Sequence, residues 1–252
     1  MSSPFLPYLP IKLIEAAFRN APGSELSSGK LSSPESSAAL AANTFGLFLN
    51  RPQDVPPLPN AEDCGWPAID VGIEVCCRFP WSGGTHPWLD ACVETSSHII
   101  GIESKRYEPF RTKGQGKFSK AYWRDVWGDC MQPFERLRDD ISSGTAEFER
   151  LDAVQLIKHA FGLRTQATRR GKRPVLFYLY AEPQSWQNGN AVAADARAVH
   201  RAETAEFAGR VASAEVSFRH CTYRQLLDVF RNSPSSELMQ HADEILQRFS
   251  PL

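Results

Sequence analysis

The sequence predicts an α/β protein in which a mixed central β-sheet is flanked by helices. Three strand-like segments, over 69–79, 90–95 and 98–105, follow one another with only short turns between them, which is typical of antiparallel strands. Two later strand-like segments, over 175–181 and 215–221, each follow a helical segment, as parallel strands reached through helical crossovers do. An antiparallel meander that continues into parallel strands gives a mixed sheet.

The first part of the chain predicts two helices before the sheet. An amphipathic helix over 11–19 leads into a Gly/Ser-rich connector over 21–33. A second helix is expected from residue 34 to about residue 49. Its start is marked by an N-cap, a first-position proline and a first-turn acid, which are Ser33, Pro34 and Glu35. Four prolines within 52–59 exclude a helix there and predict an extended linker.

The second and third strand-like segments predict a β-hairpin with Ser96 and Ser97 as its two-residue loop. With that loop, Asp90 on one strand faces Glu103 on the other. Strand alternation places Lys105 on the same face as Glu103, and two isoleucines on the opposite face. The hairpin therefore gathers two carboxylates and one ammonium group on one face of the sheet.

Beyond the hairpin, the Gly/Lys-rich stretch over 114–120 predicts a loop. A helical stretch over 118–142 follows, with breaks near Gly128 and Pro133. The remaining elements, in order, are a helix over 146–161 that ends at Gly162, a basic run over 164–173, the strand over 175–181, a helix over 191–212, the strand over 215–221, a helix over 223–231 capped by Thr222, and a helix over 235–249.

The bulk composition is that of an ordinary globular protein. The chain has 252 residues, 42% of them hydrophobic, and a net charge of −1, so a single domain spanning 1–252 is enough to bury its core. No apolar run approaches the ~20 residues that span a bilayer, and the first residues lack the pattern of a signal peptide. The six cysteines form no CxxC or zinc-ligand pattern. We therefore expect a cytoplasmic protein without disulfides, structural zinc or membrane contact.

The hairpin carries a motif with a known context. Glu103-Ser104-Lys105 directly extends an apolar strand, and Asp90 occupies the facing strand, three residues after Pro87. With a helix and a strand before the hairpin and a helix and a strand after it, this resembles the PD-(D/E)xK nuclease superfamily, whose restriction-endonuclease-like fold has an αβββαβ core. Two residues are inserted here between the Pro and the Asp of that motif.

Within this superfamily the sequences HPWLDACVET and IIGIESKRYEPF are most similar to uncharacterised restriction endonucleases. The resemblance covers about 35–181. It implies a nuclease-like core over about 34–182, with an N-terminal helix and a C-terminal helix–strand–helix as additions.

The resemblance implies a metal-dependent endonuclease that hydrolyses phosphodiester bonds of DNA. Asp90 and Glu103 would bind Mg²⁺ or Mn²⁺ together with the backbone carbonyl of Ser104, because these cations prefer oxygen ligands. Lys105 would orient or deprotonate the attacking water and add positive charge beside the phosphate. On its own, an E-x-K tripeptide is most often part of a surface strand with cross-strand charge pairs.

Three further residues are candidates for the same site. Glu74, which we expect opposite about Cys92, is either a further metal ligand or an exposed strand carboxylate. Gln155 lies at the edge of the apolar stripe of a helix, where it either acts beside the carboxylates or forms a polar helix boundary. Glu35 is either an extra ligand or an N-terminal helix charge.

Two basic stretches favour a polyanionic partner. Residues 105–124 contain seven basic side chains against one acidic, and residues 164–173 contain five against none. The candidate nucleic-acid contacts are Arg106, Arg111, Lys113, Lys117, Lys158, Arg169, Arg170 and Lys172. Tyr122, Trp123 and Trp127 offer surfaces for base stacking. The alternative interpretation is of solvated loops with core tryptophans.

Two other classes of function stay open. A nucleic-acid-binding protein could keep the nuclease fold without cleaving, and an interaction module could use the fold as a scaffold only. DNA is the expected partner, RNA is not excluded, and a homodimer would account for paired cuts in a duplex. The sequence has no recognisable module for reading bases and no Walker A loop.

Overall fold

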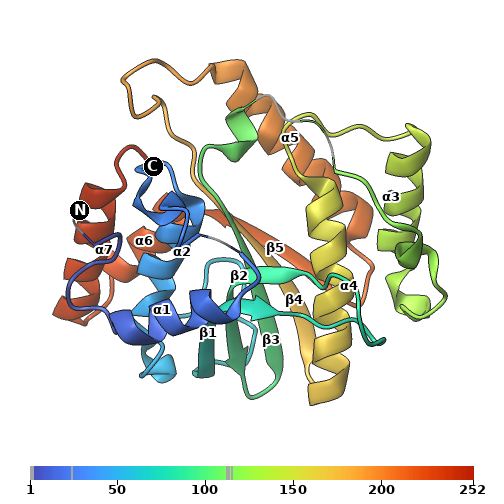
Figure 1. Ribbon diagram of the computed structural model, residues 1–252, viewed down its shortest axis with the longest axis horizontal. Helices are drawn as coiled ribbons and strands as arrows, with labels where there is room; N and C mark the ends of the chain where they lie inside the picture. Colours follow the sequence, from blue (N-terminus) through green and yellow to red (C-terminus); the bar gives the residue numbers. More distant parts are fainter. Residues whose placement is uncertain (1–2, 24, 112–113, 115) are drawn as a thin grey trace.

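A mixed β-sheet forms the centre of the computed structural model, which describes residues 3–23, 25–111, 114 and 116–252 (Figure 1). Within these residues the sheet has five strands in the order β1-β2-β3-β4-β5. The first three are antiparallel neighbours, and β4 and β5 are added in parallel. The strands are β1 (Ala68–Cys76), β2 (Trp88–Thr95), β3 (His98–Lys105), β4 (Arg173–Tyr180) and β5 (Ser217–Thr222). The predicted α/β class with a mixed sheet is confirmed.

Helices cover both faces of the sheet (Figure 1). One layer packs on a core that includes Ile100, Ile102 and Phe177, and it consists of α1 (Ile11–Asn20), α2 (Ser37–Gly46), α6 (Tyr223–Arg231) and α7 (Ser236–Arg248). The other layer packs on a core that includes Phe161 and Leu176, and it consists of α3 (Gln132–Ser143), α4 (Ala153–Arg170) and α5 (Ala194–Val211). The two isoleucines of β3 thus lie on the predicted face.

The β2–β3 hairpin has the predicted register. Ala91 pairs with Ile102 and Glu94 with Ile99, so Ser96-Ser97 is the loop between the strands. The Thr95 hydroxyl accepts from the backbone N–H of His98 at 3.0 Å, which closes the turn. Continuing the register by one residue places Asp90 opposite Glu103.

The predicted start of α2 is wrong by three residues. Ser36 is the N-cap, and its hydroxyl accepts from the Ala39 N–H at 3.1 Å. Pro34 lies before the helix because its carbonyl accepts from the buried Arg106 guanidinium. Glu35 therefore lies outside α2, where it pairs with Arg111.

Residues 52–59 are not an extended linker. They begin with a 3₁₀ turn, Pro52–Asp54, that packs on β1, and Val55 and Leu58 are buried in the core. The four prolines exclude an α-helix, as expected, but the apolar side chains between them hold the segment against the sheet.

The helix predicted over 118–142 forms a continuous α-helix only from residue 132 onward, as α3, and Pro133 lies in the first turn of that helix. Two short 3₁₀ turns, Lys120–Trp123 and Asp129–Met131, precede α3. Gly128 has a φ of +86°, which ends any helix at that point. Trp127 is buried and stacks on Phe161 with ring centroids 4.3 Å apart, so tertiary packing of an aromatic ring determines this segment.

The predicted bounds of α4 are also wrong. The helix begins at Ala153, with Asp152 as its N-cap, and passes through Gly162 to end at Gly171, whose φ is +63°. A Cβ at position 162 would lie 2.5 Å from the Cγ of Pro87 and 2.8 Å from the Cys77 carbonyl oxygen. Gly162 therefore permits close packing of the helix on the sheet and does not terminate it.

The C-terminal part agrees with the prediction. Thr222 caps α6 with a complete capping box, and Ser235 caps α7. Among the residues that the structure describes, no helix is long and apolar enough to cross a membrane.

Candidate active site

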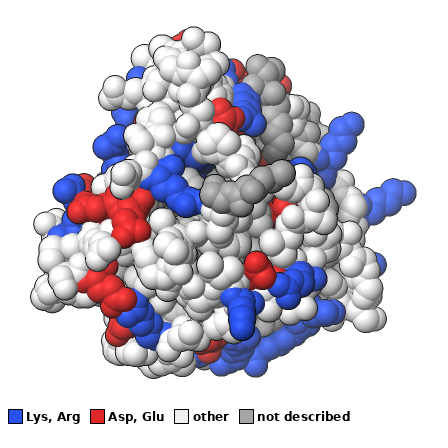
Figure 2. Space-filling view, turned by 60° about the vertical axis from the view of Figure 1, so that its left-hand side comes forward, with Lys and Arg blue, Asp and Glu red and all other residues white. Residues whose placement is uncertain are grey.

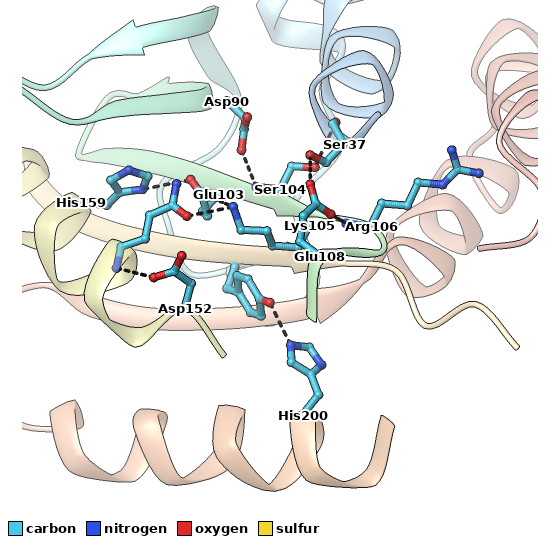
Figure 3. Close-up of polar contacts among 12 residues, drawn as sticks. Ser37, Asp90, Glu103, Ser104, Lys105, Arg106, Glu108, Asp152, His159 and His200 are labelled. Atoms are coloured by element: carbon cyan, nitrogen blue, oxygen red, sulfur yellow. Dashed lines mark hydrogen bonds and ion pairs between the residues drawn. The ribbon is translucent and has the colours of Figure 1, made fainter. Parts of the chain in front are cut away.

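The β2–β3 hairpin delivers Asp90 to the carboxyl end of β3. Oδ2 of Asp90 accepts from the backbone N–H of Ser104 at 2.7 Å (Figure 3). This bond crosses from one strand to the other and fixes the carboxylate beside Glu103. Burial and the Glu103 charge raise the pKa of Asp90 well above its ordinary value.

Glu103 is the buried centre of the cluster, with a side chain only 2% exposed. Oε1 contacts the Lys105 ammonium group, and Oε2 lies 3.0 Å from Nδ1 of His159 (Figure 3). Burial alone would raise the pKa of Glu103, but these two neighbours lower it to about 2. Glu103 is therefore ionised at neutral pH.

Lys105 connects the hairpin to α4. Its Nζ donates to Glu103 and to Oε1 of Gln155, the latter at 2.9 Å. Burial lowers the pKa of Lys105, but Glu103 and Asp90 more than offset this and raise it above its ordinary value. Lys105 is thus a cation held in place by Glu103 and Gln155.

Glu74 lies opposite Asp90 and not opposite Cys92. The pairs Ile73–Ala91 and Val75–Leu89 flank it on β1, whereas Cys92 pairs with Gly72. The pairing of β1 with β2 is centred on Ser82, one residue earlier than the prediction requires, and this moves the partner of Glu74 by two residues. Glu74 has a φ of +51°, unusual for a residue with a side chain. Burial, with Glu25 and Glu103 nearby, raises its pKa to about 7.

Ser104 faces the other side of β3. Its hydroxyl lies 2.6 Å from the hydroxyl of Tyr223 on α6 and 3.4 Å from the backbone oxygen of Ser37. The Ser104 side chain therefore faces away from the carboxylates, and its backbone N–H is the group that contacts Asp90.

His159 is a site residue that the sequence did not reveal. It follows Gln155 by four positions on α4, so both side chains lie on the same face of the helix. The i, i+4 spacing of Gln155 and His159 is the sequence signal that points to His159, whereas Lys158 is the residue that the basic pattern indicates. The Lys158 ammonium group instead donates to the backbone oxygen of Lys117 at 2.9 Å and does not contact the carboxylates.

A pocket opens beside Lys105, and Arg111, Asp152 and Tyr178 line it. The Arg111 guanidinium pairs with Glu35 and lies 5.7 Å from the centre of the Trp186 ring, so Arg111 is one predicted basic residue that lies near the cluster. Glu35 is held in this ion pair, away from the hairpin carboxylates. Lys113 lies outside the described residues.

Arg106 is not available to a nucleic acid. It is fully buried, and its guanidinium donates to the backbone oxygens of Pro34 and Phe249. Figure 3 shows its side chain extending away from Glu103 and Lys105. The prediction of a phosphate contact is wrong because alternation along the chain directs Arg106 into the opposite layer.

The second basic stretch lies far from the carboxylates. Arg169 and Arg170 end α4 and Lys172 follows it, so all three lie at the opposite end of the sheet from Lys105. Figure 2 shows Lys and Arg side chains gathered along the lower edge of the molecule, the edge at which α4 ends in Figure 1. Arg170 and Lys172 pair with Glu94, and Arg169 donates to the Arg78 and Phe79 carbonyls. The second basic stretch therefore lies near the site residues of α4 in sequence but not in the structure.

The predicted stacking residues differ in exposure. Trp127 is in the core, Tyr122 is 8% exposed, and Trp123 is 45% exposed. The Trp123 indole N–H donates to Asp139 at 2.9 Å. Of the three, only Trp123 presents a large exposed surface.

The donor set of the hairpin fits a hard divalent cation. Among the described residues, no group of three His, Cys, Asp or Glu side chains is arranged to hold a metal ion. Mg²⁺ does not require three such side chains, because it is commonly held by one or two carboxylates with waters and substrate phosphates. Burial and the nearby Glu103 charge raise the pKa of Asp90, and a cation bound between the two carboxylates would relieve their repulsion. Both Glu103 oxygens are engaged, but each keeps a further acceptor position.

A mixed sheet between two helical layers, with an Asp, a Glu and a Lys on one face of neighbouring strands, defines an α/β protein with the restriction-endonuclease-like fold. The profile of the family described as "Restriction Endonuclease associating with ARP" matches residues 10–247, and the chain belongs to this family. The match extends beyond the 35–181 core of the resemblance at both ends. No curated protein and no solved structure matches the chain.

Proposed function

We propose that this protein is a metal-dependent nuclease that hydrolyses phosphodiester bonds of DNA, of a restriction or defence type. The observation that carries the proposal is the cluster at the carboxyl end of β3. Asp90 is fixed by the Ser104 N–H, and Glu103 is held between Lys105 and His159. Membership of a restriction endonuclease family supports a nuclease, and DNA is the substrate that such a family favours.

Asp90 and Glu103 would hold Mg²⁺ or Mn²⁺, with the Ser104 carbonyl and Glu74 as candidates for further ligands. The metal would supply a water of lowered pKa and neutralise charge on the phosphate. Lys105, as a fixed cation 2.9 Å from the Gln155 amide oxygen, orients that water and stabilises negative charge in the transition state. Gln155 and His159 keep Lys105 and Glu103 in position.

The test is cleavage of supercoiled plasmid DNA in Mg²⁺, Mn²⁺ or EDTA. Wild type nicks or cuts the plasmid only with metal, and Asp90→Asn, Glu103→Gln and Lys105→Ala each lower the rate at least 100-fold. Asp70→Asn and Lys12→Ala, at exposed positions on β1 and α1, serve as matched controls and retain the wild-type rate. Equal cleavage by wild type and the three site variants would refute the assignment.

The same preparations separate this function from its alternative. A protein that binds DNA but never cuts it, with either metal, would be the non-cleaving nucleic-acid-binding protein. A two-fold dimer is the form expected for cutting both strands of a duplex, and sedimentation of the protein with and without DNA would reveal it.

A further inference from the structure

A second pocket is lined by His159, the residue that contacts Glu103, and we call it the Trp81 pocket. It has a volume of about 370 Å³, which is in the range of small-ligand pockets. It forms between the turn that follows β1, the segment around residues 117–122, and α4. The lining residues that matter here are Phe79, Trp81, His86, Tyr122, Lys158 and His159.

His159 joins the pocket to the candidate active site. One ring nitrogen, Nδ1, lies 3.0 Å from Glu103, and the residue also lines the pocket. Figure 3 shows the second ring nitrogen pointing away from Glu103. A group bound in the pocket against His159 would therefore be separated from the Glu103 carboxylate by the His159 side chain.

The polar lining of the pocket suits a polyanion. Lys117 and Lys158 line it, and among its described lining residues there is no Asp or Glu. Nδ1 of His86 accepts from the Phe79 N–H at 3.1 Å, so in the neutral ring the proton is on Nε2, which can donate to a ligand. Burial and two nearby arginines lower the pKa of His86, which favours this neutral form.

The remaining walls are aromatic. The Phe79 and Trp81 rings lie 4.8 Å apart, and Phe79 meets Tyr122 edge to face at 5.5 Å. The Arg124 guanidinium lies 4.4 Å from the centre of the Trp81 ring and adds positive charge to this wall. An aromatic wall with a few donors and a cationic rim has the chemistry of a site for one nucleotide, the base against the rings and the phosphates at the lysines.

We propose that the Trp81 pocket receives one unpaired base of the DNA strand that is cut, so that the substrate is single-stranded or carries unpaired nucleotides at the cut. This inference rests on the proposed nuclease function. A base inside a duplex is stacked and paired, and it enters a pocket only after extrusion, which costs least when the base is already unpaired. The pocket therefore selects for unpaired DNA.

The test compares a fluorescein-labelled 12-nucleotide DNA strand with the duplex of the same sequence, by anisotropy in Ca²⁺. Wild type binds the strand at least tenfold more tightly than the duplex. Thr85→Trp, which adds an indole to the lining, and Lys117→Ala, which removes a cation, each weaken strand binding at least fivefold. Thr145→Trp, an equal increase in size at an exposed position beyond α3, has no effect.

Tight binding of the duplex, or unchanged strand binding by both pocket variants, would overturn the inference. Cleavage of the same two DNAs in Mg²⁺ keeps it separate from the proposed function. If neither DNA is cut but strand binding depends on the pocket, the nuclease function fails and the pocket stands. If both are cut equally and the pocket variants bind like wild type, the pocket alone fails.

Discussion

Glu103 and Glu74 are both buried carboxylates of the site, but their pKa values are shifted in opposite directions. Lys105 and His159 overcome the burial of Glu103 and lower its pKa to about 2. Glu74 meets only other carboxylates in the described part of the chain, so its pKa rises to about 7. The cluster therefore contains an ionised Glu103, a protonated Lys105, and two acids with raised pKa values, Asp90 and Glu74. A bound divalent cation would change the protonation of these two acids.

Replacement of Glu74 by Gln removes a pH dependence of stability. Because the folded protein raises the pKa of Glu74 from 4.5 to about 7, the stabilising contribution of the protonated acid is present below pH 4.5 and is lost as the pH rises through 7. The free energy of unfolding of Glu74→Gln minus that of wild type should rise by at most about 3 kcal/mol from pH 4.5 to pH 8.5. Urea unfolding in EDTA measures it, and a difference that stays constant with pH contradicts the assignment.

His159→Asn tests the residue that the sequence did not reveal. The variant leaves Glu103 with Lys105 as its only strong partner, and loss of such an orienting contact typically costs 10–100-fold in activity. We expect a fall of that size in the single-turnover cleavage rate, with the unfolding transition kept. His220→Asn on β5 is the control, and a His159→Asn rate within twofold of wild type would show that the contact is dispensable.

At the scale of elements, α4 determines which basic residues can act at the site. Its first turns, capped by Asp152, carry Gln155 and His159 to the hairpin. At about 1.5 Å per residue, Arg170 then lies about 22 Å further along the helix axis from Gln155. The close approach at Gly162 sets the distance between helix and sheet, and so the reach of Gln155 to Lys105.

Two glycine substitutions test that packing. Gly162→Ala places a Cβ within 2.8 Å of Pro87 and of the Cys77 carbonyl oxygen, and it should destabilise the fold by about 1–3 kcal/mol and slow cleavage. Gly209→Ala on α5 meets nothing within 4 Å and should stabilise by up to about 1 kcal/mol. Chemical denaturation gives both values, and equal effects of the two substitutions would show that position 162 is not tightly packed.

At the scale of the whole molecule, features encoded over a few residues could be predicted from the sequence. Strand alternation and a two-residue loop fix the hairpin register, and local capping residues mark the starts of α6 and α7. Features set by distant contacts could not be predicted. From the sequence alone, Gly162 is expected to end a helix, and only its close contact with the sheet shows its role. Trp127 is likewise expected within a helix, and only its stacking on Phe161 shows why it is not.

The candidate site divides in the same way. The positions of Asp90, Glu103 and Lys105 follow from one hairpin and could be predicted. The contribution of α4 could be predicted only in part, because the orientation of a helix on a sheet depends on packing across the molecule. Arg106 lies away from the site because it is one residue further along the chain than Lys105 and faces the opposite layer. The basic residues at the end of α4 lie away from it because the length of the helix separates them from Gln155.

The measurement that tests the central claim most directly is Mn²⁺ titration of the metal-free protein by calorimetry, with Glu103→Gln, Asp90→Asn and the control Glu62→Gln in parallel. Glu62 is an exposed carboxylate outside the cluster. If Asp90 and Glu103 hold the metal, wild type and Glu62→Gln bind Mn²⁺ with equal affinity, and each site variant binds it at least tenfold more weakly, because one of two carboxylate ligands is lost. Equal affinity in all four proteins would contradict the account.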